Sequence, residues 1–132
     1  MSERVYVAAS FEQRNEVRAL YEQIRAGGHT ITADWVSHKE VAAARSIKER
    51  QALKRRYAVE DTDGVKSASV YVLLLGERKS TGAHIEFGIA LGAEVPRICL
   101  IGKPDAEQLF YTHPAVSVYP TTRAFIKMLN EI

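Results

Sequence analysis

Cysteine, net charge and long apolar runs are all scarce in this sequence of 132 residues, and each shortage excludes a class of protein. The single cysteine, Cys99, cannot form an internal disulfide, and its place in the apolar run 98–101 favours a small buried side chain. The net charge of +2 is too small to indicate a nucleic acid polymer or a membrane surface as partner. No segment approaches the roughly 18 apolar residues of a membrane span. No signal peptide precedes the first strand-like run, so we expect a cytoplasmic protein.

The remaining composition, 46% hydrophobic and 26% charged, is typical of one globular domain, which we expect to span 1–132. Apolar runs predict five strands, at 5–9, 30–35, 69–75, 97–101 and 116–119. Helical spacing predicts helices at 11–26, which Gly27 and Gly28 would end, at 40–57 with a continuation towards 67, at 83–93 and at 121–132. This alternation predicts an α/β fold in which helices cover both faces of a parallel five-stranded sheet.

Four common ligand motifs are incomplete. The stretch 76–82 lacks the Gly-Lys-Ser/Thr ending of a P-loop, and no Gly-x-Gly-x-x-Gly follows the first strand. The segment 61–64 lacks the remaining ligands of a calcium loop. The four histidines show no metal-ligand spacing, and one cysteine cannot complete a zinc site. We therefore expect neither a metal nor a cofactor.

The most informative stretch is 80–92, which follows the apolar run 68–75 as a small-residue turn and then a helix. Ser80, Thr81 and Gly82 would stand at the helix N-terminus, where free N–H groups and the helix dipole favour an anion. Glu86 would follow within about one turn. An anion site beside a carboxylate suggests chemistry on a sugar phosphate.

Other polar residues are expected at the same edge of the sheet. Ligands of doubly wound sheets bind at the carboxyl ends of the strands, where the strand order reverses. Ala9 and Ser10 end the first strand, which contains Tyr6, and Asp61 precedes the third strand. With Glu86, these residues form a candidate site.

In order along the chain, these residues resemble the nucleoside 2-deoxyribosyltransferase superfamily. The matching parts are Val5-Tyr6-Val7-Ala8-Ala9-Ser10, then Glu60-Asp61, then Ser80-x-Gly82-x-x-x-Glu86-x-Gly88-x-Ala90. The resemblance covers nearly the whole chain, and its last part is the most specific. It implies a flavodoxin-like fold.

The resemblance also implies roles for three residues: Glu86 as nucleophile, Tyr6 as the group that orients it, and Asp61 as the group that protonates or holds the leaving base. These residue types suit cleavage of a nucleoside C1′–N bond. A carboxylate stabilises the positive charge on the sugar and then bonds to C1′, while an acid supplies a proton to the departing base.

One departure separates the branches of this superfamily. Ser80 stands where typical deoxyribosyltransferases have an aspartate, which would repel a phosphate. Serine there resembles the 2′-deoxynucleoside 5′-monophosphate N-glycosidase branch, in which the loop after the first strand also grips phosphate. That implies a phosphate site at Ala9, Ser10, Arg14, Ser80 and Gly82, although residues 11–13 replace that branch's glycine-rich loop.

Plainer interpretations stand beside these roles. Glu86 would also serve as an ordinary first-turn carboxylate, Tyr6 as a core residue and Ser80 as a helix cap. Trp35 would either stack on the base or pack in the core. The aromatic segment 109–114 suits a subunit interface, because members of the superfamily commonly complete their sites with a neighbour's residues; we expect a homodimer or a higher homo-oligomer.

The preferred function is hydrolysis of a nucleoside 5′-monophosphate. Base exchange by a nucleoside 2-deoxyribosyltransferase is the enzymatic alternative. A non-catalytic nucleotide-binding or signalling domain is the alternative from another class.

Overall fold

The structure is a computed structural model that describes residues 2–38 and 41–132. Its five strands are β1 (Arg4–Ala8), β2 (Thr30–Ile31), β3 (Val70–Leu74), β4 (Arg97–Ile101) and β5 (Val116–Tyr119). Its four α-helices are α1 (Arg14–Ala26), α2 (Ile47–Ser67), α3 (Thr81–Gly92) and α4 (Thr122–Glu131). Short 3₁₀ helices lie at Phe11–Gln13, Trp35–Ser37, Val41–Ala43 and Leu109–Thr112.

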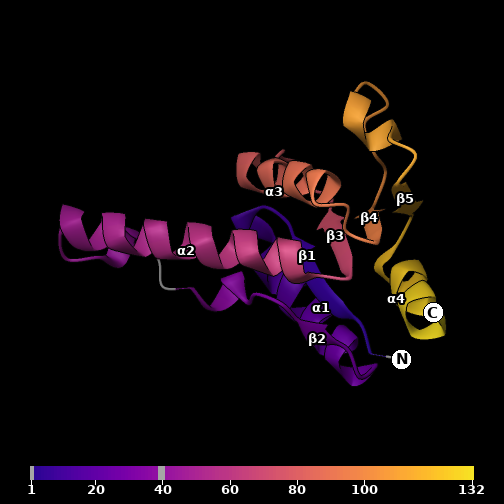
Figure 1. Cartoon of the computed structure of the whole chain (residues 1–132), viewed down its shortest axis with the longest axis horizontal. Coiled ribbons are helices and arrows are strands. Elements are labelled where there is room, and N and C mark those ends of the chain that lie inside the picture. Colours follow the sequence, from indigo (N-terminus) through magenta and orange to yellow (C-terminus); the bar gives the residue numbers. More distant parts are fainter. Residues whose placement is uncertain (1, 39–40) are drawn as a thin grey trace.

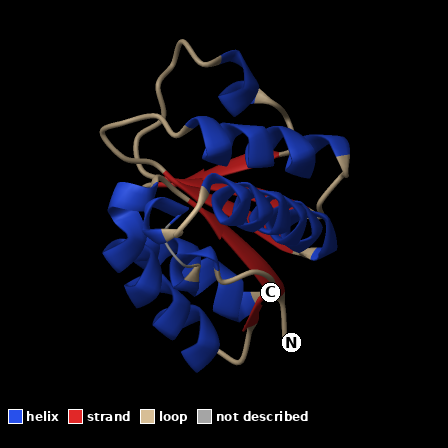
Figure 2. Cartoon of the chain, turned by 90° about the vertical axis from the view of Figure 1, so that its left-hand side faces the viewer, coloured by secondary structure: helices blue, strands red, loops and turns tan. Residues whose placement is uncertain are grey.

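All five strands pair in parallel, in the order β2-β1-β3-β4-β5. Helices α2 and α3 pack side by side on one face of the sheet, and α1 and α4 pack together on the other. Figure 2 shows the sheet between these layers of helices. The expected parallel five-stranded α/β sheet is thus confirmed, and its strand order is the flavodoxin-like one.

The central strands are buried from end to end, which explains their composition. Every residue of β3 is buried, and in β1 and β4 only the first residue is exposed. A strand covered on both faces has no polar side, so its sequence is a continuous apolar run rather than an alternation. Burial of these side chains is the main favourable term in the stability of such a sheet.

Strand β2 is shorter than the sequence suggests. The prediction for 30–35 is wrong beyond Ile31, because Trp35 lies in a 3₁₀ helix. Its indole Nε1 donates a hydrogen bond of 2.6 Å to the carbonyl oxygen of Val7 in β1. The Trp35 side chain thereby satisfies the carbonyl group of Val7, which the backbone of a longer β2 would otherwise have paired.

The helices differ from the expected ranges mainly at their starts. The first begins as a 3₁₀ turn and becomes α1 at Arg14, and Gly28, with a φ of 87°, follows its end. Helix α2 begins at Ile47, after Ser46 caps it, and runs through to Ser67; the first residue of the predicted 40–57 helix lies outside the described residues. Within the described residues, no helix is long and apolar enough to cross a bilayer.

Candidate active site

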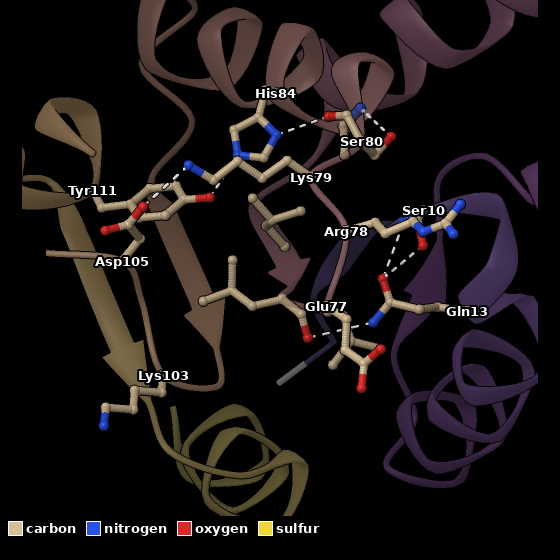
Figure 3. Close-up of a pocket in the computed structure, with 15 residues that line it drawn as sticks. Ser10, Gln13, Glu77, Arg78, Lys79, Ser80, His84, Lys103, Asp105 and Tyr111 are labelled. Carbon is tan, nitrogen blue, oxygen red and sulfur yellow. Dashed lines mark hydrogen bonds and ion pairs between the residues drawn. The ribbon is translucent and has the colours of Figure 1, made fainter. Parts of the chain in front are cut away.

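Two cavities open at the carboxyl end of the sheet, on either side of the turn that starts α3. The larger, of about 650 Å³, is lined by residues of α2, α3 and the loops after β1 and β2, Glu86 and Asp61 among them. The smaller, of about 260 Å³, lies over the ends of β3 and β4 and is drawn in Figure 3. Ser80 and Ala83 line both cavities. The two spaces therefore meet at this turn, beside the point where the strand order reverses between β1 and β3.

Glu86 is held in place from the sheet below it. The Tyr71 hydroxyl of β3 donates a 2.9 Å hydrogen bond to the carbonyl oxygen of Ala83, which fixes the first turn of α3. The Tyr6 hydroxyl of β1 donates to Oε2 of Glu86. The Tyr6 ring is fully buried and stacks on the Tyr71 ring at an interplanar angle of 5°. Two adjacent strands thus position one carboxylate at the wall of the larger cavity.

The surroundings of Glu86 and Tyr6 shift both acidities. Burial raises the pKa of Glu86 to about 7; the hydrogen bond from Tyr6 opposes this shift and the negative charge of Asp61 adds to it. Burial raises the pKa of Tyr6 as well, and the charge of Glu86 raises it further. Tyr6 consequently keeps its proton and acts as a donor, while Glu86 exchanges its proton near neutrality.

Asp61 lies on α2 and lines the same cavity as Glu86. Its Oδ1 is buried and, among the described residues, has no hydrogen-bond partner; Nε2 of His38 lies 3.8 Å away. Burial raises the pKa of Asp61, an effect that His38 opposes and Glu60 strengthens. A buried acceptor without a partner is costly unless a ligand or water satisfies it. This atom is therefore available to a bound molecule.

The approach of α2 to the sheet depends on Gly64, one turn after Asp61. A Cβ at this position would come within 2.6 Å of the Ala33 Cβ and 3.2 Å of Cδ2 of Tyr6. The Gly64 carbonyl also accepts a 2.7 Å hydrogen bond from the Thr32 hydroxyl. A residue without a side chain lets α2 lie directly against Tyr6.

Aromatic rings form the outer wall of the larger cavity. Trp35 is 9% exposed and packs in the core, and it also lines this cavity; its stacking on a base stays a prediction. Phe11 lies beside it, with 6.4 Å between ring centroids. His38 stacks on Tyr57 with centroids 3.8 Å apart. Flat surfaces of this kind suit a planar ring ligand.

His38 and Tyr57 were missed by the sequence reasoning. Each is an isolated residue in a polar segment, and only the fold brings them together.

The smaller cavity differs in that ion pairs and hydrogen bonds occupy several of its polar groups. Lys79 pairs with Asp105 at 3.2 Å, and Arg78 pairs with Glu12 at 3.2 Å. The His84 ring donates from Nδ1 to the Ser80 carbonyl at 2.8 Å, and the Tyr111 hydroxyl lies 2.5 Å from its Nε2 (Figure 3). His84 thus points away from Glu86 and ties the Ser80 turn to the segment Leu109–Thr112.

The residues expected to bind substrate are divided between the cavities. Ala9, Ser80 and Gly82 line the larger one, and Ser10 lines the smaller one together with Ser80. Ser80 caps α3, because its Oγ accepts a 3.2 Å hydrogen bond from the Ala83 N–H. Arg14 lines neither cavity: its guanidinium lies 4.8 Å from the centre of the Phe11 ring and donates to the Phe11 carbonyl. The binding roles of these residues stay predictions.

Known structures share this fold. The CMP N-glycosidase BcmB of Clostridium botulinum matches with a TM-score of 0.64 and 17% identity over 97% of this chain and 99% of its own. A 2-deoxyribosyltransferase of Bacillus psychrosaccharolyticus gives 0.70 and 17%, over 93% and 90%. A conserved protein of Enterococcus faecalis gives 0.67 and 14%, over 99% of both chains. This is the fold of the nucleoside 2-deoxyribosyltransferases.

The fold that the sequence motifs imply is therefore confirmed, and at these identities the likeness reaches the fold alone. No protein-family model matches the sequence, and the search of curated proteins gave no match.

Proposed function

We propose that this protein is an N-glycosidase that cleaves the C1′–N bond of a nucleoside 5′-monophosphate, with Glu86 as nucleophile. One observation carries the proposal: the half-buried Glu86 carboxylate, held by the Tyr6 hydroxyl, shares a cavity with the buried Oδ1 of Asp61, which accepts no hydrogen bond from the described residues. The names of two structural neighbours, a CMP N-glycosidase and a 2-deoxyribosyltransferase, describe chemistry at the same kind of bond.

In the first step an oxygen of ionised Glu86 bonds to C1′ while the C1′–N bond breaks and its electron pair goes to the base. Because Tyr6 donates to Oε2, the other carboxylate oxygen is left for C1′. The proton that the base needs comes from Asp61, which lines the same cavity and whose pKa burial raises above the ordinary value. The products of this step are a glycosyl-Glu86 ester and a neutral base.

In the second step water attacks C1′ and Glu86 leaves as a carboxylate. Asp61, now ionised, accepts the proton of that water, which restores both groups to their starting states. Tyr6 again donates to the released carboxylate and stabilises its charge. The net reaction consumes one water and yields free base and sugar phosphate.

The two cavities suit the two ends of such a substrate. The aromatic wall formed by Trp35, Phe11 and the His38–Tyr57 pair offers flat surfaces to a base. Beyond Ser80, the smaller cavity is lined by Lys103 and by Lys79, whose ammonium pairs with Asp105; a phosphate with its larger charge would compete with that carboxylate for Lys79. A sugar bridging the Ser80 turn would present C1′ to Glu86 and its 5′-phosphate to the other side.

Base exchange is the second candidate, because a 2-deoxyribosyltransferase shares the fold. The same glycosyl-Glu86 ester would then be attacked by a second base instead of water. A domain that binds nucleotides without turnover is the alternative outside enzymes, and it gives no reason for a buried Glu86 beside Tyr6 and Asp61.

The deciding experiment incubates the protein with a panel of nucleoside 5′-monophosphates and the matching nucleosides, with ribose and with 2′-deoxyribose, and measures base release by chromatography. Acid-quenched samples are analysed by mass spectrometry for a glycosyl adduct on the peptide that contains Glu86. Free sugar phosphate supports hydrolysis, whereas incorporation of a labelled free base supports transfer. Binding without any base release would overturn both enzymatic proposals.

A further inference from the structure

Gln13 is an unusual residue at the carboxyl end of the sheet. Within the described residues, Gln13 and His29 are the two polar residues in the buried class, and Gln13 is 9% exposed. Its Oε1 accepts two hydrogen bonds of 3.1 Å from Ser10, one from the backbone N–H and one from the hydroxyl (Figure 3). Its Nε2 donates to the Leu75 carbonyl oxygen at 3.4 Å.

These contacts lie where the strand order reverses. Ser10 follows β1 and Leu75 follows β3, and these two strands are neighbours. Gly76 leaves room for the Gln13 amide, since a Cβ at this position would lie 2.8 Å from its Cδ. The Gln13 side chain therefore spans the crevice in which sheets of this topology bind their ligands.

The two Ser10 donors are those that a phosphate at this loop would use. A phosphate oxygen binds to backbone N–H and hydroxyl groups, and its charge makes these bonds stronger than those to a neutral amide. In this structure both donors are directed to the neutral carbonyl oxygen of Gln13. A ligand phosphate must displace that oxygen to reach them, and the buried amide then loses its partners at a cost.

We infer that Gln13 is a specificity-determining residue: its amide occupies the Ser10 donors and so weakens the binding of a substrate's 5′-phosphate. This inference rests on the proposed function. The phosphate is held mainly from the Ser80 side and by Lys79 and Lys103, and Gln13 sets how far nucleotides are preferred over nucleosides.

A purely structural role for Gln13 would use the same bonds. Gln13 and Ser10 form a capping box at the start of the 3₁₀ turn Phe11–Gln13, and the bond to Leu75 ties that turn to β3. Loss of such a brace would impair nucleotides and nucleosides alike. The ratio of kcat/KM for a monophosphate to that for its nucleoside separates the two roles.

The test compares wild type with Gln13→Ala, and with Gln23→Ala, an exposed glutamine of α1, as the matched control. We expect Gln13→Ala to raise the nucleotide-to-nucleoside ratio about tenfold, because it frees two donors for a charged ligand. Ser10→Ala in the Gln13→Ala background should remove much of the gain. Gln13→Glu should lower the ratio below wild type, since a carboxylate repels phosphate. An unchanged or reduced ratio in Gln13→Ala overturns the inference.

Two further measurements keep the result decisive. Gln13→Met, with a side chain of similar length and a poor acceptor, replaces Gln13→Ala if the latter does not fold. Binding of inorganic phosphate, measured by calorimetry at fixed ionic strength, needs no turnover, and we expect it to tighten in Gln13→Ala. Tighter phosphate binding without base release from any substrate would refute the proposed function and leave this inference standing. Base release with the same nucleotide-to-nucleoside ratio in Gln13→Ala as in wild type would support the proposed function and refute this inference.

Discussion

The two cavities on either side of Ser80 differ in how far their charged side chains are buried and paired. In the larger one, Glu86 and Asp61 are half-buried, and burial raises the pKa of both. In the smaller one, Lys79 and Arg78 are exposed and paired with carboxylates. Withdrawing a carboxylate from water costs stability that its partners must offset, whereas an exposed ion pair contributes little. Chemistry is therefore expected on the Glu86 side of the turn and binding on the other.

The sharpest test of this contrast is Glu86→Gln, which removes the nucleophile at almost constant volume. We expect base release to fall at least about 1,000-fold, because without a carboxylate no covalent intermediate forms. Chromatography of the released base gives the rate, and the glycosyl adduct should be absent from the mass spectrum. Glu22→Gln, an exposed position on α1, is the matched control. Undiminished hydrolysis in Glu86→Gln would refute the mechanism.

Asp61→Asn should produce the next largest effect. We expect kcat/KM to fall about 100-fold, because the departing base loses its proton donor. Substrates whose base leaves easily without protonation should lose less. Asp63→Asn, an exposed aspartate two residues further along α2, is the control. Equal losses in both variants would assign Asp61 to the helix rather than to the reaction.

The burial of Glu86 predicts an effect on stability that needs no substrate. Its folded-state pKa of about 7 lies above the ordinary value of 4.5. Between these values the folded protein binds more protons than the unfolded chain, so the free energy of unfolding decreases as pH rises. Glu86→Gln has no such penalty and should be more stable than wild type by about 2 kcal/mol at about pH 8. The stability advantage of Glu86→Gln should largely disappear at about pH 4. Urea denaturation of both proteins at the two pH values measures it. An equal advantage at the two pH values would contradict the proposed effect of burial on Glu86.

Tyr6→Phe tests how the sheet controls the nucleophile. The Tyr6 hydrogen bond lowers the Glu86 pKa, so its removal should raise that pKa and shift the acid limb of the pH–kcat/KM profile upward by about one unit. Activity at neutral pH should fall about fivefold in consequence, because the ionised fraction of Glu86 falls from about one half to about one eleventh. Tyr21→Phe, which removes a hydroxyl bonded to the Ala33 carbonyl, is the control. A uniform loss at every pH would mean that Tyr6 only packs.

The smallest expected effects belong to the boundary between the cavities. Ser80→Ala should lower the free energy of unfolding by about 1 kcal/mol through loss of the α3 cap. It should also raise KM for a monophosphate several-fold while leaving KM for the nucleoside nearly unchanged. Ser80→Gly keeps most of the cap stability, so it isolates the hydroxyl's contact with phosphate. An equal rise in KM for the monophosphate and for the nucleoside would mean that Ser80 acts only as a helix cap.

The fold was largely predictable because burial governs the strands that form its centre. Continuous apolar runs located β1, β3 and β4 within a residue or two. The prediction for 30–35 was wrong past Ile31 for a reason that no local pattern contains: Trp35 bonds to Val7 in a neighbouring strand. The start of α2 was also misjudged, because the cap at Ser46 lies inside a stretch rich in Ala, Arg and Lys that favours a helix on both sides of it.

The site was only partly predictable. Tyr6, Asp61 and Glu86 were identified from a family pattern; the structure places Asp61 and Glu86 on the wall of one cavity, with the buried Tyr6 bonded to Glu86 from behind it. The stacking of His38 on Tyr57 joins a loop to a helix and leaves no trace in either segment alone. The replacement of a glycine-rich loop by residues 11–13 was visible in the sequence, but that Gln13 turns inward to Ser10 depends on the space above Gly76.

The missing side chain of Gly64 has a consequence for engineering. Because α2 rests on Tyr6 at this point, even one added methyl group would push the helix outward. Asp61, one turn earlier, would move with it while every reacting group stayed chemically intact. Gly64 thus sets the distance between Asp61 and Glu86 from beneath the helix. Because Gly64 does not line the larger cavity, a search confined to cavity-lining residues would overlook it.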